Sequence, residues 1–185
     1  EMLLRNSLLH IPQKTPVLGK YGASRIREGI RILNKYSVDS LLDVGSAFGD
    51  LVVNARMHGI KSYGLEPTKK IVGMINKNTD ANIIESGLFP EKSGPLNFYD
   101  AVTFFHSLIY FPSITKSIFE KLRSILNSAG IVLILTYDTE TLNEEINRKE
   151  LLENPMATNF TSEKFFRLVC DEFDFKSYNR IKCYA

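Results

Sequence analysis

The stretch that most constrains the fold is LLDVGSAFGDLVVNARMHGIKSYGLEP, at residues 41–67. An apolar run ends at Asp43, and a turn containing Gly45 and Gly49 follows. A helical pattern then leads to a second short run that ends at Glu66. This pattern predicts a β–loop–α–β unit with an acidic residue at the end of each strand. Such a unit belongs to a parallel sheet and is typical of proteins that bind a nucleoside.

The spacing of the glycines excludes two common phosphate-binding loops. A dinucleotide fingerprint needs Gly-x-Gly-x-x-Gly, and the segment from Gly45 to Gly49 lacks that pattern. A phosphate loop continues as Gly-Lys-Ser/Thr, whereas Gly49 is followed by Asp50, whose negative charge repels a phosphate. The loop is therefore suited to a nucleoside without phosphates. Glu66 lies where an acid at the second strand end can accept hydrogen bonds from ribose hydroxyls.

Three motifs resemble those of the class I S-adenosylmethionine-dependent methyltransferases. The first motif of that family, apolar-apolar-Asp-x-Gly-x-Gly-x-Gly, reads LLDVGSAFG at 41–49, with Ala47 in place of the middle Gly. The second, Gly-x-Glu-Pro-Ser in many members, reads GLEPT at 64–68. The third, YDAVTFFHSLIYF at 99–111, resembles the fourth strand and the cofactor-facing loop, with Ile109-Tyr110 where the family has Glu-His.

Two further segments extend the resemblance to about residues 22–183. IIESGLFP at 83–90 resembles the third strand and the loop that packs on adenine, and AGIVLILT at 129–136 resembles the fifth strand. The implied fold is α/β, a Rossmann-like doubly wound, mostly parallel sheet flanked by helices. The family's final antiparallel strand has no counterpart in the sequence. The chain is then a fragment, or that strand is missing or comes from another chain, and a bare sheet edge could pair in a homodimer.

We predict a single methyltransferase domain over residues 1–185. Its parts are an N-terminal segment and cap helix (1–38), a cofactor-binding core (39–136), and a substrate-side insert, helix and last strand (137–185). Residues 1–20 contain two prolines and little periodicity, which predicts a loop or short helix. Apolar spacing and helix start and stop signals predict helices at 23–36, 50–58, 69–78, 115–127 and 165–173. The charged segment 139–153 is also expected to be a helix, and 175–184 a closing strand.

The composition of the chain limits the kinds of partner and ligand that we expect it to bind. The net charge of +2 gives no support for binding to nucleic acid or to an anionic membrane. No apolar run is long enough for a transmembrane helix, and the first residues lack the apolar core of a signal peptide. The two cysteines, Cys170 and Cys183, form no ligand cluster or disulfide framework. We therefore expect no metal and a reduced, cytoplasmic setting.

The resemblance implies S-adenosyl-L-methionine as the cofactor. Asp43 is expected to organise the first loop by accepting bonds from backbone N–H groups or, through water, from the methionine amino group. Glu66 is expected to hold the ribose hydroxyls. The implied contacts come from the first loop (Asp43, Gly45, Ser46, Ala47, Gly49), the ribose end (Glu66, Pro67), the adenine loop (Ser86, Gly87, Leu88) and the methionine end (Phe105, His106).

The predicted function is methyl transfer to a small-molecule acceptor, at a hydroxyl oxygen, by in-line displacement. The choice of oxygen comes from the family branch, whose members often modify sugars, quinones or natural products. His106 is the candidate catalytic residue, because an imidazole with a pKa near 6.5 can accept a proton from a hydroxyl. One alternative is an inactive cofactor-binding partner subunit, motivated by Ala47, by Ile109-Tyr110 and by the missing strand. Another is a nucleic-acid or protein methyltransferase, against which low charge and the lack of an Asn/Asp-Pro-Pro-Tyr/Phe segment speak.

Overall fold

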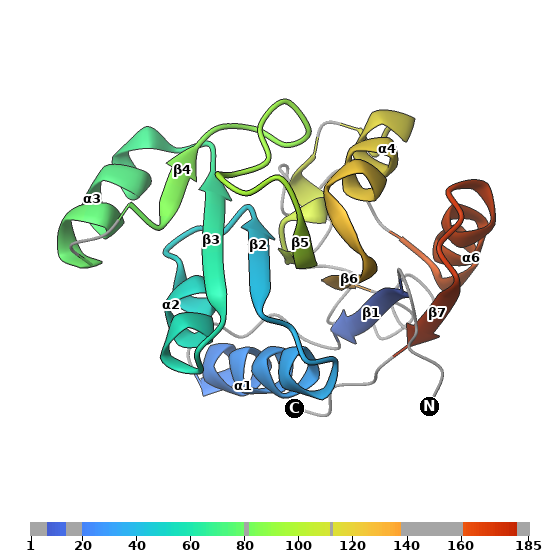
Figure 1. The fold of residues 1–185 in the computed structure, drawn as a ribbon, viewed down its shortest axis with the longest axis horizontal. Coiled ribbons are helices and arrows are strands. Elements are labelled where there is room, and N and C mark those ends of the chain that lie inside the picture. The colour runs from blue at the N-terminus through green and yellow to red at the C-terminus, as the bar shows by residue number, and fades with distance from the viewer. Residues whose placement is uncertain (1–6, 14–19, 80–81, 112, 138–160, 181–185) are drawn as a thin grey trace, which may run out of the picture.

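A computed structural model of the chain describes residues 7–13, 20–79, 82–111, 113–137 and 161–180 (Figure 1). Its centre is a seven-stranded sheet in the order β4-β3-β2-β5-β6-β1-β7. The strands are β1 (Ser7–Gln13), β2 (Ser40–Val44), β3 (Lys61–Glu66), β4 (Ile84–Ser86), β5 (Tyr99–Phe105), β6 (Leu126–Tyr137) and β7 (Ser177–Arg180). The helices are α1 (Lys20–Lys35), α2 (Asp50–Met57), α3 (Lys69–Thr79), the 3-10 turn η1 (Leu108–Tyr110), α4 (Lys116–Ile125) and α6 (Glu163–Glu172).

Helices cover both faces of the sheet, so its central strands are apolar on both sides. Successive residues of β2 point to opposite faces. Leu41 packs in a core cluster with residues of α1 and α2, including Leu33 and Ala55. Leu42 belongs to the larger cluster on the other face, which α4 and α6 cover with side chains such as Phe119. This arrangement confirms the α/β, Rossmann-like prediction.

The N-terminal strand corrects the prediction of a loop or short helix within residues 1–20. β1 lies between β6 and β7 and is parallel to both, with Leu9 opposite Leu133 of β6 and Leu8 opposite Tyr178 of β7. Pro12 indicated a chain break, but β7 pairs only with residues 7–10, so the proline lies beyond that ladder. All pairings between the described strands are parallel, and none of these strands corresponds to the family's final antiparallel strand.

The other elements follow the sequence pattern closely. The five described helices lie where periodicity predicts them, and β2 to β6 lie where the apolar runs and the family motifs place strands. β6 begins at Leu126, so the last two residues of the helix predicted at 115–127 belong to a strand instead. The predicted strand at 175–184 is shorter as described, at Ser177–Arg180, and the predicted helix at 139–153 lies outside the described residues. None of the helices described is long and apolar enough to span a membrane. The division into segments 1–38, 39–136 and 137–185 stays a prediction.

Candidate functional site

The predicted cofactor contacts lie at or just beyond the carboxyl ends of four neighbouring strands. In Figure 1, the arrowheads of β2, β3 and β4 point to the same upper edge of the sheet. β5 is parallel to β2 and follows it in the sheet order. Glu66 pairs with Ser86, so the residues predicted for ribose and for adenine are neighbours across two strands. Open α/β sheets bind their ligands at this edge.

The loop after β2 has a backbone shape that requires glycine. Gly45 and Gly49 have φ angles of 73° and 75°. A Cβ on Gly45 would lie 2.3 Å from the Cβ of Ser107, which is too close for any side chain. The N–H groups of Gly45 and Ser46 both donate to the carbonyl of Leu65, at 2.7 and 3.1 Å. The loop is therefore fixed to the end of β3 by its own backbone.

Glu66 joins this loop to the start of α3. Its side chain is buried, with Oε2 accepting from the N–H of Ala47 at 3.1 Å and Oε1 accepting from the N–H of Thr68 at 2.9 Å. Ala47 has a φ of 45°, a conformation that costs a non-glycine residue roughly 1–2 kcal/mol. The alanine that replaces the family's middle glycine thus keeps a glycine-like backbone, and the bond to Glu66 stabilises it. Each carboxylate oxygen can still accept from a ribose hydroxyl.

Ser46 is placed differently from its neighbours in the loop. Its side chain is buried, and its hydroxyl has no hydrogen-bond partner among the described residues. A Cβ at Gly64 would lie 2.5 Å from this hydroxyl, so the serine side chain packs directly on β3. The predicted cofactor contact of Ser46 stays a prediction.

Asp43 is hydrogen-bonded to a side chain that was not among the predicted site residues. It is 2% exposed, and its Oδ1 accepts a 2.6 Å hydrogen bond from the hydroxyl of Thr103 on β5. Burial raises the pKa of Asp43 to about 7, against the opposing effect of the Thr103 bond. Within the described residues, the Asp43 carboxylate accepts from this hydroxyl and from none of the expected backbone N–H groups. The bond through water to the methionine amino group stays a prediction. The signal in the sequence was a threonine between two apolar residues of β5, Val102 and Phe104.

His106 does not have the properties assumed for a general base. It follows β5 with a φ of 58°, and its backbone N–H donates to the carbonyl of Leu135 at 2.9 Å. Its Nε2 lies 3.3 Å from a guanidinium nitrogen of Arg25 on α1. Burial and the Arg25 charge lower the pKa of His106 from its ordinary value of 6.5 to about 3. The imidazole is neutral at physiological pH, and Nε2 faces a donor.

The remaining predicted contacts divide into two groups. Pro67 and Leu88 are exposed at the edge, Ser86 and Gly87 are half-buried there, and the N–H of Gly87 donates to the Glu66 carbonyl at 3.2 Å. Phe105 instead extends toward α1, because a Cβ at Gly29 would lie 2.6 Å from its Cζ. Its ring packs with the α1–α2 core cluster, so any contact with the cofactor has to use its exposed part.

A cavity of about 330 Å³ lies beside β4 but shares only Ser86 with the predicted contacts. Its other walls come from β3, from α3 and from the segments on either side of β4: Tyr63, Gly64, Asn76, Asn82, Ile83, Ile84, Glu85 and Pro95. It is therefore a neighbouring hollow, distinct from the edge where Asp43 and Glu66 meet.

Comparisons with known proteins agree with this geometry. Residues 18–178 match the family model of a methyltransferase domain. No curated protein matches the chain. The PH0226 protein from Pyrococcus horikoshii OT3 superposes with a TM-score of 0.66 at 18% identity, covering 86% of this chain and 84% of its own. The YcgJ protein from Bacillus subtilis gives 0.66 at 15%, covering 82% and 68%. A SAM-dependent methyltransferase from Archaeoglobus fulgidus gives 0.63 at 15%, covering 84% and 74%.

Proposed function

The chain belongs to the methyltransferase domain family, and from this premise we propose that it transfers a methyl group from S-adenosyl-L-methionine to the hydroxyl oxygen of an uncharged small molecule. The family is the one whose motifs the sequence resembles, and S-adenosyl-L-methionine is the cofactor that this resemblance implies. The acceptor, the atom that is methylated and the roles of individual residues are our proposals.

The observation that carries the proposal is the position of Glu66. A buried carboxylate, already oriented by two backbone N–H groups, stands at the end of β3 and beside Ser86. A fixed carboxylate suits the vicinal hydroxyls of a ribose, since it accepts two hydrogen bonds. Asp50 comes directly after Gly49 of the loop and lies in the first turn of α2. Its negative charge disfavours a phosphorylated nucleotide.

The cofactor supplies a methyl group that its sulfonium already activates, so the protein's main task is alignment. Asp43 and the loop from Gly45 to Gly49 would hold the methionine end, and Glu66 the ribose. His106 would contact the acceptor. With a pKa of about 3 its imidazole has a low proton affinity, and Nε2 already faces the guanidinium of Arg25, so we assign it to positioning the acceptor by contact and not to taking its proton.

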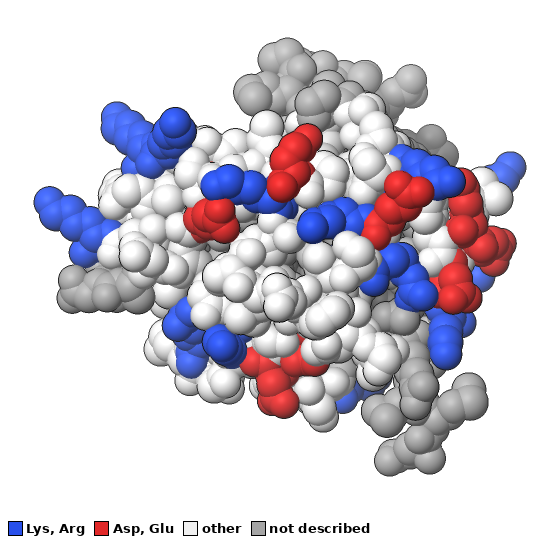
Figure 2. All heavy atoms as spheres, turned by 45° about the horizontal axis from the view of Figure 1, so that its top comes forward, with Lys and Arg blue, Asp and Glu red and all other residues white. Residues whose placement is uncertain are grey.

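Exposed aromatic side chains support an uncharged acceptor. Phe48 in the loop after β2 is 60% exposed, and Tyr110 in the turn after β5 is 48% exposed. Figure 2 turns the upper edge of Figure 1 toward the reader, and the charged side chains lie mostly around an uncharged centre. Exposed aromatic faces favour apolar or planar ligands.

Calorimetric titration with S-adenosylhomocysteine tests the cofactor, with Glu66→Ala as the variant. We expect micromolar binding by the wild type and at least a tenfold loss in the variant. Thermal unfolding of both proteins without ligand separates a lost ribose contact from a loosened loop. Binding of NAD in place of S-adenosylhomocysteine would refute the proposal. Release of S-adenosylhomocysteine during incubation with hydroxylated aromatic and sugar acceptors tests the transfer itself.

The inactive partner subunit stays a second candidate, because the low pKa of His106 makes the predicted catalytic residue a weak base. Binding of S-adenosylhomocysteine without turnover on any acceptor would favour it. A homodimer and a cytoplasmic setting also stay predictions, the first tested by light scattering of the purified chain and the second by locating the tagged protein in its own cell.

A further inference from the structure

β4 is the least supported strand of the site. It has three residues, lies at the edge of the sheet and pairs only with β3. It nevertheless ends at Ser86, and Gly87 and Leu88 follow, which are the residues predicted to flank adenine. So short an edge ladder contributes few backbone hydrogen bonds. Other contacts must therefore fix this segment.

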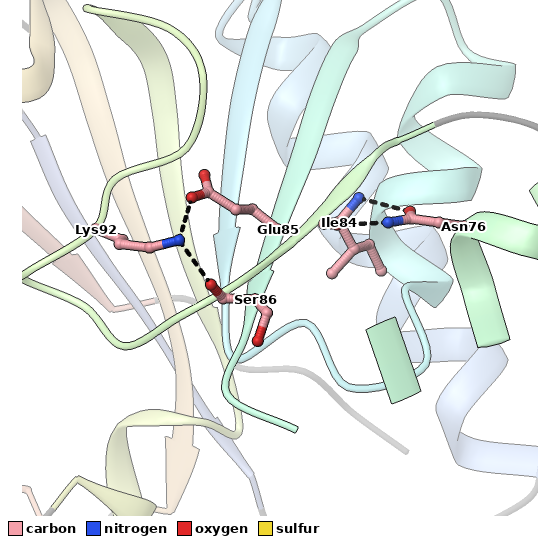
Figure 3. A network of polar contacts seen from close by, with 5 residues as sticks. All are labelled: Asn76, Ile84, Glu85, Ser86 and Lys92. Atoms are coloured by element: carbon pink, nitrogen blue, oxygen red, sulfur yellow. Dashed lines mark hydrogen bonds and ion pairs between the residues drawn. The ribbon is translucent and has the colours of Figure 1, made fainter. Parts of the chain in front are cut away.

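Two side chains hold β4 from opposite ends (Figure 3). Asn76 of α3 holds its start, because its amide donates to the carbonyl of Ile84 at 2.7 Å and accepts from the N–H of Ile83 and of Ile84, each at 3.1 Å. Lys92 holds its end, where Nζ lies 2.7 Å from Oε1 of Glu85 and donates to the carbonyl of Ser86 at 2.9 Å.

Lys92 also covers the segment that continues toward the site. A Cβ on Gly87 would lie 2.3 Å from Cδ of Lys92, so the aliphatic stem fills the space above this glycine. The backbone N–H of Lys92 donates to the carbonyl of Leu88 at 2.9 Å. One residue thus contacts each of the four consecutive positions from Glu85 to Leu88. Since the N–H of Gly87 donates to the Glu66 carbonyl, the same segment is tied to the ribose acid.

We propose that Lys92 is a positioning residue for the adenosine half of the cofactor, acting through Ser86 and Gly87. The inference rests on the proposed function, because it assumes that these residues flank adenine. A lysine suits the task, since its ammonium has three donors to share between a carboxylate and a carbonyl, and its stem packs on backbone. Lys92 itself touches no cofactor in this assignment.

The test is titration of the full chain with S-adenosylhomocysteine, comparing wild type, Lys92→Met and Lys92→Arg. Methionine keeps an aliphatic stem and removes the charge. We expect its dissociation constant to rise about three- to tenfold, the range for a half-exposed ion pair with an added hydrogen bond. Lys92→Arg keeps the charge, so the logarithm of its dissociation constant should rise by no more than half as much as that of Lys92→Met. The wild type should lose affinity as salt rises, and the methionine variant should lose less.

Matched variants separate positioning from folding. Lys92→Met removes contacts of half-exposed side chains, so it should lower the thermal unfolding temperature of the free protein only slightly. Asn76→Ala should lower it more, because it removes three hydrogen bonds to the backbone at the start of β4. Glu85→Gln removes the charge partner of Lys92 and keeps the bond of Lys92 to the Ser86 carbonyl, so it should weaken binding less than Lys92→Met does. If Lys92→Met fails to fold, Glu85→Gln tests the inference in its place. Wild-type affinity in both Lys92→Met and Glu85→Gln would overturn the inference. Absence of binding by the wild type would refute the proposed function instead.

Discussion

The hydroxyl of Thr103 donates a 2.6 Å hydrogen bond to the carboxylate of Asp43, and both side chains are buried between β5 and β2. The bond favours the ionised carboxylate, while burial favours the protonated acid. Their balance places the pKa of Asp43 at about 7. Thr103 therefore favours the charged form of this acid against the larger effect of burial.

Thr103→Val should make cofactor binding more dependent on alkaline pH. Loss of a hydrogen bond to a charged group should raise the pKa of Asp43 by about one to two units. Affinity for S-adenosylhomocysteine at pH 7 should fall, and its pH midpoint should move upward. Calorimetry between pH 6 and 9 measures the shift, with Thr103→Ser as the control that keeps the hydroxyl. Superimposable pH profiles for the valine variant and the wild type would contradict the prediction.

Asp43→Asn should stabilise the protein at alkaline pH. The pKa of Asp43 is raised from 3.8 to about 7, so between these values the native state keeps a proton that the unfolded chain has lost. The free energy of unfolding therefore falls as pH rises through this window and stays low above pH 7. A neutral asparagine escapes the penalty, with a gain of up to about 4 kcal/mol at pH 8 and almost none at pH 4. Urea unfolding at both pH values checks it, and equal differences at the two would argue against it.

Gly45→Ala should destabilise the fold by several kcal/mol. The substitution adds strain of roughly 1–2 kcal/mol at a positive φ and a collision with Ser107 worth about 1–3 kcal/mol. Gly59→Ala separates the two effects, because its φ is 83° but a Cβ there meets nothing within 4 Å. Gly73→Ala is the matched control in α3, where the space is also open and alanine should stabilise by about 0.5–1 kcal/mol. A Gly45 variant no less stable than the Gly59 variant would show that Ser107 moves aside.

Ser46→Ala should leave the fold as stable or make it more stable by about 1 kcal/mol, since it removes a buried hydroxyl without a partner among the described residues. Thermal unfolding with and without S-adenosylhomocysteine checks both roles of the residue. If the ligand-induced shift also stays unchanged, the predicted cofactor contact of Ser46 is wrong. A clear loss of the free protein's stability would mean that the hydroxyl has a partner.

The imidazole of His106 should stay neutral at pH 5. Burial and the charge of Arg25 both lower its pKa, so Arg25→Ala should raise the pKa of His106 while burial keeps it below 6.5. Two-dimensional nitrogen–proton NMR of the ring resolves the protonation state, and the exposed His58 gives a reference signal in the same spectrum. A titration of His106 between pH 6 and 7 in the wild type would restore its role as a general base.

The backbone of the site could be predicted from sequence because local patterns determine it. The apolar runs before Asp43 and Glu66 specify parallel strands, and the glycines after β2 specify a loop with positive φ. Neighbouring strand ends then meet at one edge, whatever the details of packing.

Contacts between distant side chains could not be predicted in this way. The pairing of Thr103 with Asp43 and the approach of Arg25 to His106 depend on how β2, β5 and α1 pack. The pKa of His106 follows from that burial, so the ordinary value was a poor guide. β1 was missed because Pro12 indicates a break, while its neighbours β6 and β7 lie far along the chain.

The position of β1 couples the beginning of the described chain to its end. Residues 7–10 pair with 177–180, so this ladder closes a loop that contains every other described element. Closing so long a loop carries a high entropic cost and is a slow step of folding. Among the described strands, β1 precedes all the others in the chain and can pair with β7 only after β7 has been made; β7 is short and pairs with β1 alone among them. This corner of the sheet should therefore form late and open first, and its amide hydrogens should exchange with solvent before those of β2 and β5.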